Sequence, residues 1–344
     1  CALPILLAWQ AGIEGGLAIA DILCADANPS GKLVDTFAGS FDDYPSSAGF
    51  NDSEDYVDYT EDIYVGYRYF ETIPNAAKKV NYPFGYGLSY TSFSIKNCCG
   101  RLENGTEGVQ IVVEASVTNI GDRAGKEVVQ LYYSAPQGKL GKPARVLGAF
   151  AKTRCLQPGE TQQITLRLAA DSMASYDDTG KIRKSAYVLE AGEYSFYLGN
   201  SVRNTEKVPY VYNEDTDRVV LTLRERVAPR QLARRMLADG SFEELPVQKE
   251  HTRETFPGFV EGNPPRKGQW AGDAAAAVRG TGAPDKKAML IDVVNGEVTM
   301  EEFLAQLTNG ELIDLLCGQP NTGVANTFGM GNLPEYGVPA LMTA

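Results

Sequence analysis

Acidic residues stand side by side three times between residues 42 and 62. The pairs are Asp42–Asp43, Glu54–Asp55 and Glu61–Asp62. Two carboxylates can act together as proton donor and nucleophile when they converge in space and their environments shift their pKa values apart. Neighbours in a polar loop normally stay solvated and lack the desolvation that shifts a pKa. We therefore expect these pairs to be exposed loop residues rather than catalytic groups.

Histidine and cysteine are too sparse for metal or nucleophile chemistry. The only histidine, His251, lies in the polar stretch "VQKEHTRETFPG", away from any serine or cysteine in a tight turn, so a Ser-His-Asp site is excluded. No cysteine stands in a Cys-x-x-Cys pair, so we expect no zinc site. No metal ion or organic cofactor is implied. The cysteines, expected to be free thiols or occasional core residues, are Cys1, Cys24, Cys98, Cys99, Cys155 and Cys317.

Tyrosines are concentrated just after the acidic pairs. Such rings can stack on sugars, but aromatic side chains more often anchor a long loop by burying their area, and we favour anchoring. Arg68, within this run, is expected to hold a carboxylate rather than a substrate. The tyrosines are Tyr56, Tyr59, Tyr64, Tyr67 and Tyr69.

The charge balance limits the partners of this chain. Its 344 residues include 32 Lys and Arg against 44 Asp and Glu, a net charge of −12. An acidic protein is repelled by phosphate backbones and anionic lipid, so nucleic acid and membrane surfaces are poor partners. No apolar run reaches the length that spans a bilayer. No signal peptide is visible, which weakly favours the cytoplasm, although the true N-terminus is not visible either.

The elements that would position a site begin with an α/β pattern. The run "CALPILLA", residues 1–8, is short and apolar and predicts a buried strand. Gly15 and Gly16 then lead into one apolar stripe of helical spacing, which the turn residues 28–31 end. A strand and a helix cannot bury both faces alone, so this piece needs neighbours.

An all-β pattern follows from residue 94 to residue 213. Apolar residues alternate strictly from Val109 to Val117, from Ile164 to Leu168 and from Tyr194 to Leu198. Alternation of period two indicates strands with one buried face. With turn signals between them, roughly seven short strands predict a β-sandwich of immunoglobulin or fibronectin type III kind.

The last third changes from linker to helix. Residues 214–288 are rich in Gly, Pro and Ala and predict a linker, with a short basic helix within "RERVAPRQLARRMLADG". Thr299 with Glu302 and Thr308 with Glu311 form capping boxes, and Gly318 is placed as a helix stop. The ending "YGVPALMTA" predicts a buried strand. Because apolar strands are expected at both ends, we expect these residues to be the middle of a larger protein.

The opening stretch "AWQAGIEGGLAIADILCADANPSGKLVDTF" resembles the signature near the end of the α/β sandwich domain of glycoside hydrolase family 3. Further along, "YVGYRYFET" and "YPFGYGLSYTSF" are similar to the connection into that family's fibronectin type III-like domain, and "VTNIGDRAGKEVVQLYYSAP" resembles the domain itself. The final stretch, residues 307–344, looks like the beginning of its (β/α)8 barrel. The matching signature residues are Trp9, Gly12, Glu14, Gly15, Ala18, Ala20, Asp21, Asn28, Pro29, Ser30, Gly31, Lys32 and Leu33.

The resemblance implies a multidomain chain in circularly permuted order. The expected parts are the C-terminal end of an α/β sandwich (1–45), a long connecting loop (46–93), a fibronectin type III-like β-sandwich (94–213), a linker (214–288) and the start of a (β/α)8 barrel (289–344). Many permuted members are β-glucosidases, which would release terminal glucose from β-glucosides with retention.

The same resemblance places no catalytic residue in this chain. The family's nucleophilic aspartate would follow Ala344, its acid/base glutamate would precede Cys1, and its sugar-gripping aspartate would come next after Ala344. The turn containing Glu14 is structural in the family. Only Met342 and Thr343, at the end of the first barrel strand, are expected near the substrate. The implied partners are a β-glucoside or oligosaccharide and the rest of the enzyme.

Two alternatives stay open. A non-catalytic β-sandwich scaffold or carbohydrate-binding protein would also account for the missing carboxylates, and its ends should lie outside strands. Within the family, a β-xylosidase or another exo-glycosidase fits equally, because the loops that contact the sugar lie elsewhere. The sequence does not settle the oligomeric state.

Overall fold

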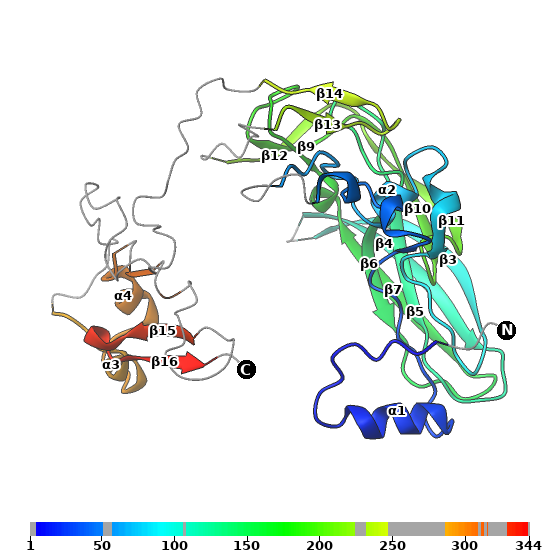
Figure 1. Cartoon of the computed structure of the whole chain (residues 1–344), viewed down its shortest axis with the longest axis horizontal. Helices are drawn as coiled ribbons and strands as arrows, with labels where there is room; N and C mark the ends of the chain where they lie inside the picture. Colours follow the sequence, from blue (N-terminus) through cyan, green and yellow to red (C-terminus); the bar gives the residue numbers. More distant parts are fainter. Residues whose placement is uncertain are drawn as a thin grey trace. The chain divides into compact units, whose positions relative to one another are not determined.

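The chain forms two compact units, Cys1–Gln248 and Lys249–Ala344 (Figure 1). The computed structural model describes residues 5–50, 57–105, 108–223, 232–246, 286–308, 311–312, 315 and 329–342. Each unit has its own hydrophobic core.

A β-sandwich of two antiparallel sheets is the centre of the first unit (Figure 1). The three-stranded sheet has the order β3-β4-β7, with β3 at Phe93–Gly105, β4 at Gly108–Asn119 and β7 at Thr161–Ala169. The four-stranded sheet has the order β11-β10-β5-β6, with β5 at Val128–Ser134, β6 at Val146–Lys152, β10 at Gly192–Gly199 and β11 at Thr205–Glu214. The predicted sandwich is thus confirmed.

The core between these sheets comes from the alternating residues. Ile111, Val113, Ala115 and Val117 of β4 are all fully buried. The corresponding residues of β7 and β10 pack against them in the same cluster. Because side chains of a strand alternate between faces, a register fixed by turns puts every second residue into the core.

A turn between β8 (Ser175–Asp177) and β9 (Ala186–Leu189) is organised by one buried carboxylate. The Asp177 Oδ1 atom accepts the N–H groups of Gly180 and Lys181 at 2.7 and 3.0 Å, and Oδ2 accepts those of Ile182 and Arg183 at 2.7 Å each. Burial alone would raise the pKa of Asp177, but these four donors outweigh it and hold the pKa below its ordinary value.

Part of the predicted linker is folded, and its predicted basic helix is wrong for the described residues. β12 (Arg218–Thr222) joins β9 and β8 in a third sheet. The segment around Arg234 forms β13 (Arg234–Met236), which pairs with β14 (Phe242–Glu244). The charges explain the hairpin, because Arg235 finds acidic partners across it and on the neighbouring loop.

The segment before the sandwich has little regular structure. It holds α1 (Gly15–Leu23), the pair β1 (Phe37–Ala38) and β2 (Val80–Tyr82), and α2 (Tyr67–Phe70), with 3-10 turns η1 (Phe41–Asp43), η2 (Ser47–Gly49) and η3 (Ala76–Lys79). The predicted helix is confirmed. The predicted buried strand is wrong for residues 5–8, which are exposed and unpaired, because no described strand lies beside them.

The second unit is small. α3 (Leu290–Val294) and α4 (Met300–Ala305) pack with the antiparallel pair β15 (Gly329–Leu333) and β16 (Val338–Met342), around Phe303, Leu307 and Leu333. η5 (Pro334–Tyr336) joins the two strands. Both predicted capping boxes are confirmed. Gly318 lies outside the described residues.

Candidate functional site

The turn 28–31 binds the sandwich through Asn28. Its Nδ2 atom donates to the Ala124 carbonyl at 3.0 Å. Its Oδ1 atom accepts from the Ser89 hydroxyl at 2.8 Å and from the Tyr90 N–H at 2.9 Å. The short amide side chain thereby joins three stretches of chain, which is a structural task rather than a catalytic one.

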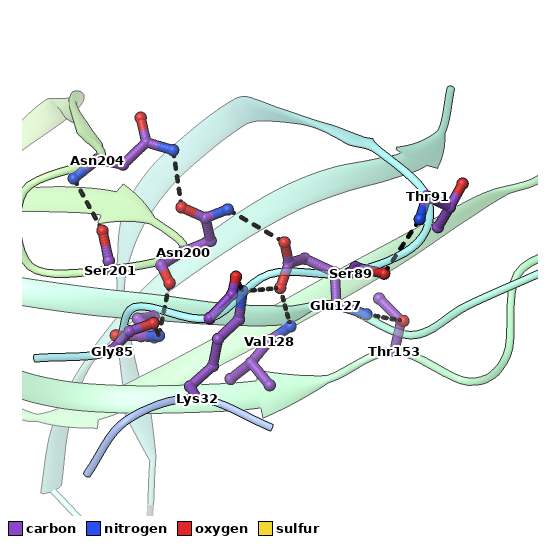
Figure 2. A network of polar contacts seen from close by, with 12 residues as sticks. Lys32, Gly85, Ser89, Thr91, Glu127, Val128, Thr153, Asn200, Ser201 and Asn204 are labelled. Carbon is purple, nitrogen blue, oxygen red and sulfur yellow. Dashed lines mark hydrogen bonds and ion pairs between the residues drawn. The ribbon is translucent and has the colours of Figure 1, made fainter. Parts of the chain in front are cut away.

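A buried ion pair lies beside this turn. The Lys32 Nζ atom is 2.8 Å from Glu127 Oε1, and the two side chains are 12% and 7% exposed. Figure 2 shows Glu127 at the centre of the network, where it also accepts the Val128 N–H at 2.7 Å and the Asn200 amide at 3.1 Å. We call Asn28, Lys32, Glu127 and Asn200 the junction. With its charge paired and both of its oxygens hydrogen-bonded, Glu127 serves to hold these segments together.

The neighbouring Gln130 extends the junction under the next loop. Its Nε2 atom donates to the carbonyls of Asn200 at 2.8 Å and Gly85 at 3.3 Å, and its Oε1 atom accepts from Tyr132 at 2.5 Å. Gly85 adopts a φ of +78°, and a Cβ atom there would lie 2.3 Å from the Gln130 side chain. Only glycine can adopt this positive φ without strain and also let its backbone lie this close to the Gln130 side chain.

A second group of charged residues surrounds Arg235. Its guanidinium is 2.8 Å from Asp178 and 2.6 Å from Glu243, while Asp62 lies further away at 3.6 Å. Burial raises the pKa of Asp62, and the charge of Arg235 only partly opposes this. Arg235, Asp62 and Asp178 border a cavity of about 490 Å³.

The acidic pairs differ from one another in the structure. Asp43 caps η1 and lies 3.1 Å from Lys79, as expected of a surface pair. The expectation of solvation is wrong for Glu61, which is 4% exposed, and Asp62 borders the cavity. The cause is the fold of the loop, which turns back onto β13 through the bond from Met236 N–H to the Thr60 carbonyl. Glu54–Asp55 lies outside the described residues, and Glu14 precedes α1 without capping it.

The tyrosine run serves mainly as an anchor, as predicted. Tyr64 is buried, and the Tyr67 hydroxyl accepts the Leu147 N–H at 3.0 Å. Tyr59 is the exception, with 68% of its surface exposed, and Tyr56 lies outside the described residues. The predicted carboxylate partner of Arg68 is not found, because within the described ranges no ion pair involves it. Arg68 instead lines the cavity.

The two residues expected near a substrate are only partly described. Met342 ends β16, where it pairs with Gly329. Thr343 lies outside the described residues. Free thiols are described at Cys24, Cys99 and Cys155. In the part of the chain that the structure covers, no three His, Cys, Asp or Glu side chains gather as a metal site would require, and no helix has the length and apolarity to cross a bilayer.

Sequence reasoning missed the roles of four of these residues. Lys32 and Asn28 belong to the signature "NPSGKL", but nothing local reveals that their partners lie about a hundred residues later. Glu127 stands in "GKEVVQ" at the start of an apolar strand, where a buried charge is a signal for a buried partner. Arg235 was hidden inside an expected basic helix.

The first stretch of the chain matches a known domain. Residues 3–90 match the model of the glycosyl hydrolase family 3 C-terminal domain. Residues 127–202 match that of the fibronectin type III-like domain. The two matches fall on the two sides of the junction.

Similar proteins match nearly the whole chain. It is 51% identical to a β-glucosidase A of Butyrivibrio fibrisolvens over 98% of its own length and 43% of the relative's, and 39% identical to a β-glucosidase of Ruminococcus albus over 98% and 34%. Among solved structures, a β-glucosidase from Paenibacillus barengoltzii is similar with a TM-score of 0.71 and 44% identity, over 96% of this chain and 36% of that one. The chain thus spans less than half the length of these relatives.

Proposed function

We propose that the chain belongs to glycosyl hydrolase family 3 and forms part of a retaining, exo-acting β-glucosidase. The identity of 51% to a β-glucosidase across 98% of this chain carries the proposal. The reaction would release terminal glucose from β-glucosides or oligosaccharides by the two-carboxylate mechanism, in which one carboxylate attacks the anomeric carbon and the other exchanges a proton.

We infer that both catalytic carboxylates lie outside this chain. Retention requires two carboxyl groups about 5–5.5 Å apart across the scissile bond. The buried carboxylates with defined partners serve other tasks: Glu127 pairs with Lys32, Glu190 with Lys142, and Asp177 with backbone N–H groups. The chain's own contribution is then structural, since the junction fixes the family 3 domain to the fibronectin type III-like domain.

The exposed apolar side chains of α1 support a larger assembly. Leu17 and Leu23 are about two-thirds exposed, and Ile13 and Val34 beside the helix are more so. Several large apolar side chains exposed on and next to one short helix are typical of a surface that another part of a protein covers. We propose that the remainder of the α/β domain covers it, which makes the rest of the enzyme the main partner of this chain.

The order of the parts supports a permuted enzyme. The family 3 C-terminal match precedes the fibronectin type III-like match, and α3, α4 and β16 follow both. We propose that residues 289–344 open the (β/α)8 barrel. Met342 and Thr343 would then lie at the carboxyl end of its first strand, where barrel enzymes build their active sites.

An activity comparison tests the proposal. The complete gene product should hydrolyse an aryl β-glucoside, and NMR of the first-formed sugar should show the β-anomer. The isolated 344 residues should show no turnover. Turnover by the isolated chain would overturn the placement of the carboxylates, and preference of the complete enzyme for the aryl β-xyloside would replace glucosidase by xylosidase.

A further inference from the structure

A cavity of about 490 Å³ opens on the fibronectin type III-like side of the first unit. Its volume lies within the range of about 300–1,000 Å³ that is typical of small-molecule sites. Five parts of the chain far apart in sequence line it: the loop 62–68, Tyr133 of β5, the stretch 140–148, the segment 168–178, and Arg235 of β13. None of these residues belongs to the junction or to the proposed catalytic centre.

Buried polar contacts fix one wall of this cavity. Glu190 accepts the N–H groups of Lys139 at 2.5 Å and Leu140 at 3.3 Å, and it pairs with the buried Lys142 at 2.9 Å. Tyr67 holds the opposite loop to the Leu147 N–H at 3.0 Å. A wall held in this way is preformed, so a ligand would lose little affinity to the ordering of loops.

The charges that line the cavity cancel. Asp62 and Asp178 carry two negative charges, and Arg68 and Arg235 carry two positive ones. Asp178 and Arg235 are paired at 2.8 Å, whereas Asp62 is 3.6 Å from the guanidinium and 36% exposed. Arg68 is exposed and makes no ion pair within the described ranges. The cavity therefore offers one carboxylate with a single, long ion pair and one guanidinium with none among the described residues.

Aromatic and hydroxyl groups complete the lining. Tyr133 and Tyr176 contribute ring surface, and Ser172 and Ser175 contribute hydroxyls. Burial raises the pKa of Tyr133 to about 12, and the nearby charge of Arg68 opposes this rise only in part. The phenol is therefore protonated at neutral pH and can donate a hydrogen bond. Ring faces bury the apolar side of a ligand, and hydroxyls both donate and accept.

We propose that this cavity is a non-catalytic binding site for a neutral saccharide. A ring with neighbouring hydroxyls can donate to the Asp62 carboxylate and accept from the Arg68 guanidinium while its apolar face lies against a tyrosine. An anionic ligand would satisfy Arg68 but face Asp62, and a cationic ligand would do the reverse. The balance of charge therefore favours a neutral, polyhydroxylated ligand.

Binding to the full 344-residue chain tests this proposal. Saturation-transfer NMR and calorimetry with glucose and cellobiose should detect binding, and Arg68→Met and Asp62→Ala should each weaken it about tenfold or more, because each removes a hydrogen bond to a charged group. The matched control Arg154→Met changes an exposed arginine that pairs with Glu160, outside the cavity. It should leave binding unchanged.

Three results would overturn the proposal. These are the absence of any glucose or cellobiose binding, binding that both cavity variants leave intact while they melt like the parent chain, and tighter binding of glucuronate than of glucose. None of them bears on the activity of the complete enzyme, so this proposal and the proposed function fail separately.

Discussion

The junction and the cavity around Arg235 are both charged, but their charges are used differently. At the junction Lys32 and Glu127 are almost fully buried and 2.8 Å apart, and further donors occupy the carboxylate. At the cavity Asp62 is 36% exposed and lies 3.6 Å from Arg235, further than the other acidic partners of that guanidinium, and Arg68 is exposed and makes no ion pair among the described residues. Buried charges that are completely paired serve to join parts of the fold, whereas open charges in a preformed cavity are available to a ligand.

Removing the centre of the junction should have the largest effect. Glu127→Ala leaves the Lys32 ammonium buried without its partner, and breaking a buried pair in this way costs about 3–5 kcal/mol. Urea unfolding of the variant measures the loss. Glu193→Ala is the control, because its pair with Lys207 is exposed at 3.8 Å and should contribute less than about 1 kcal/mol. Equal losses in the two variants would contradict the structural role of the junction.

The turn at Asp177 should come next, with a defined pH dependence. Its pKa is lowered in the folded state, so its stabilisation is present above the ordinary aspartate pKa of about 4 and disappears as the pH falls through the folded value. In Asp177→Asn the side-chain NH₂ group replaces one carboxylate oxygen, so two of the four buried N–H groups lose their acceptor. The free energy of unfolding should fall by about 3 kcal/mol at pH 7. Unfolding measured from pH 7 down to pH 3 should show the gap between parent and variant narrowing. A constant gap would contradict this account.

Substituting Gly85 should cost less. Alanine there has an unfavourable positive φ and displaces Gln130 from its two carbonyl partners, for a total of about 2 kcal/mol. Gly159→Ala is a matched control, because Gly159 has a φ of +79° and open space around it. Its loss of stability, about 1 kcal/mol, measures the cost of the positive φ alone. If both glycines behave alike in thermal melts, the Gln130 contacts contribute nothing.

At the cavity the smallest effect on stability is expected. Burial raises the pKa of Asp62, so this carboxyl group binds a proton more tightly in the folded chain than in the unfolded chain. The folded chain therefore loses stability as the pH rises above about 4 and Asp62 becomes ionised. Asp62→Asn removes this cost, and because the group is partly exposed the gain at pH 7 should stay below about 1 kcal/mol. If Asp62→Asn instead lowered the stability at pH 7, Asp62 would be a residue that holds the fold together, as the junction residues do.

The sequence predicted what depends on local pattern. The strands with alternating Val109 to Val117 and the capping box at Thr299 follow from period and spacing alone. Failures came where the outcome depends on distant partners: residues 5–8 have no described strand beside them, Glu61 is buried by a loop that folds back, and Arg235 takes strand geometry because acids lie around it. The junction needed Lys32 and Glu127 to be seen together, which no local pattern provides.

One urea-unfolding experiment tests the contrast between the two regions most directly. Lys32→Met and Arg68→Met both replace a long cationic side chain with an uncharged one of similar length. The account predicts a loss of about 3 kcal/mol in the free energy of unfolding for Lys32→Met, because Glu127 stays buried without its cation, and a change below about 0.5 kcal/mol for Arg68→Met. Equal losses for the two variants, or a larger one for Arg68→Met, would contradict it.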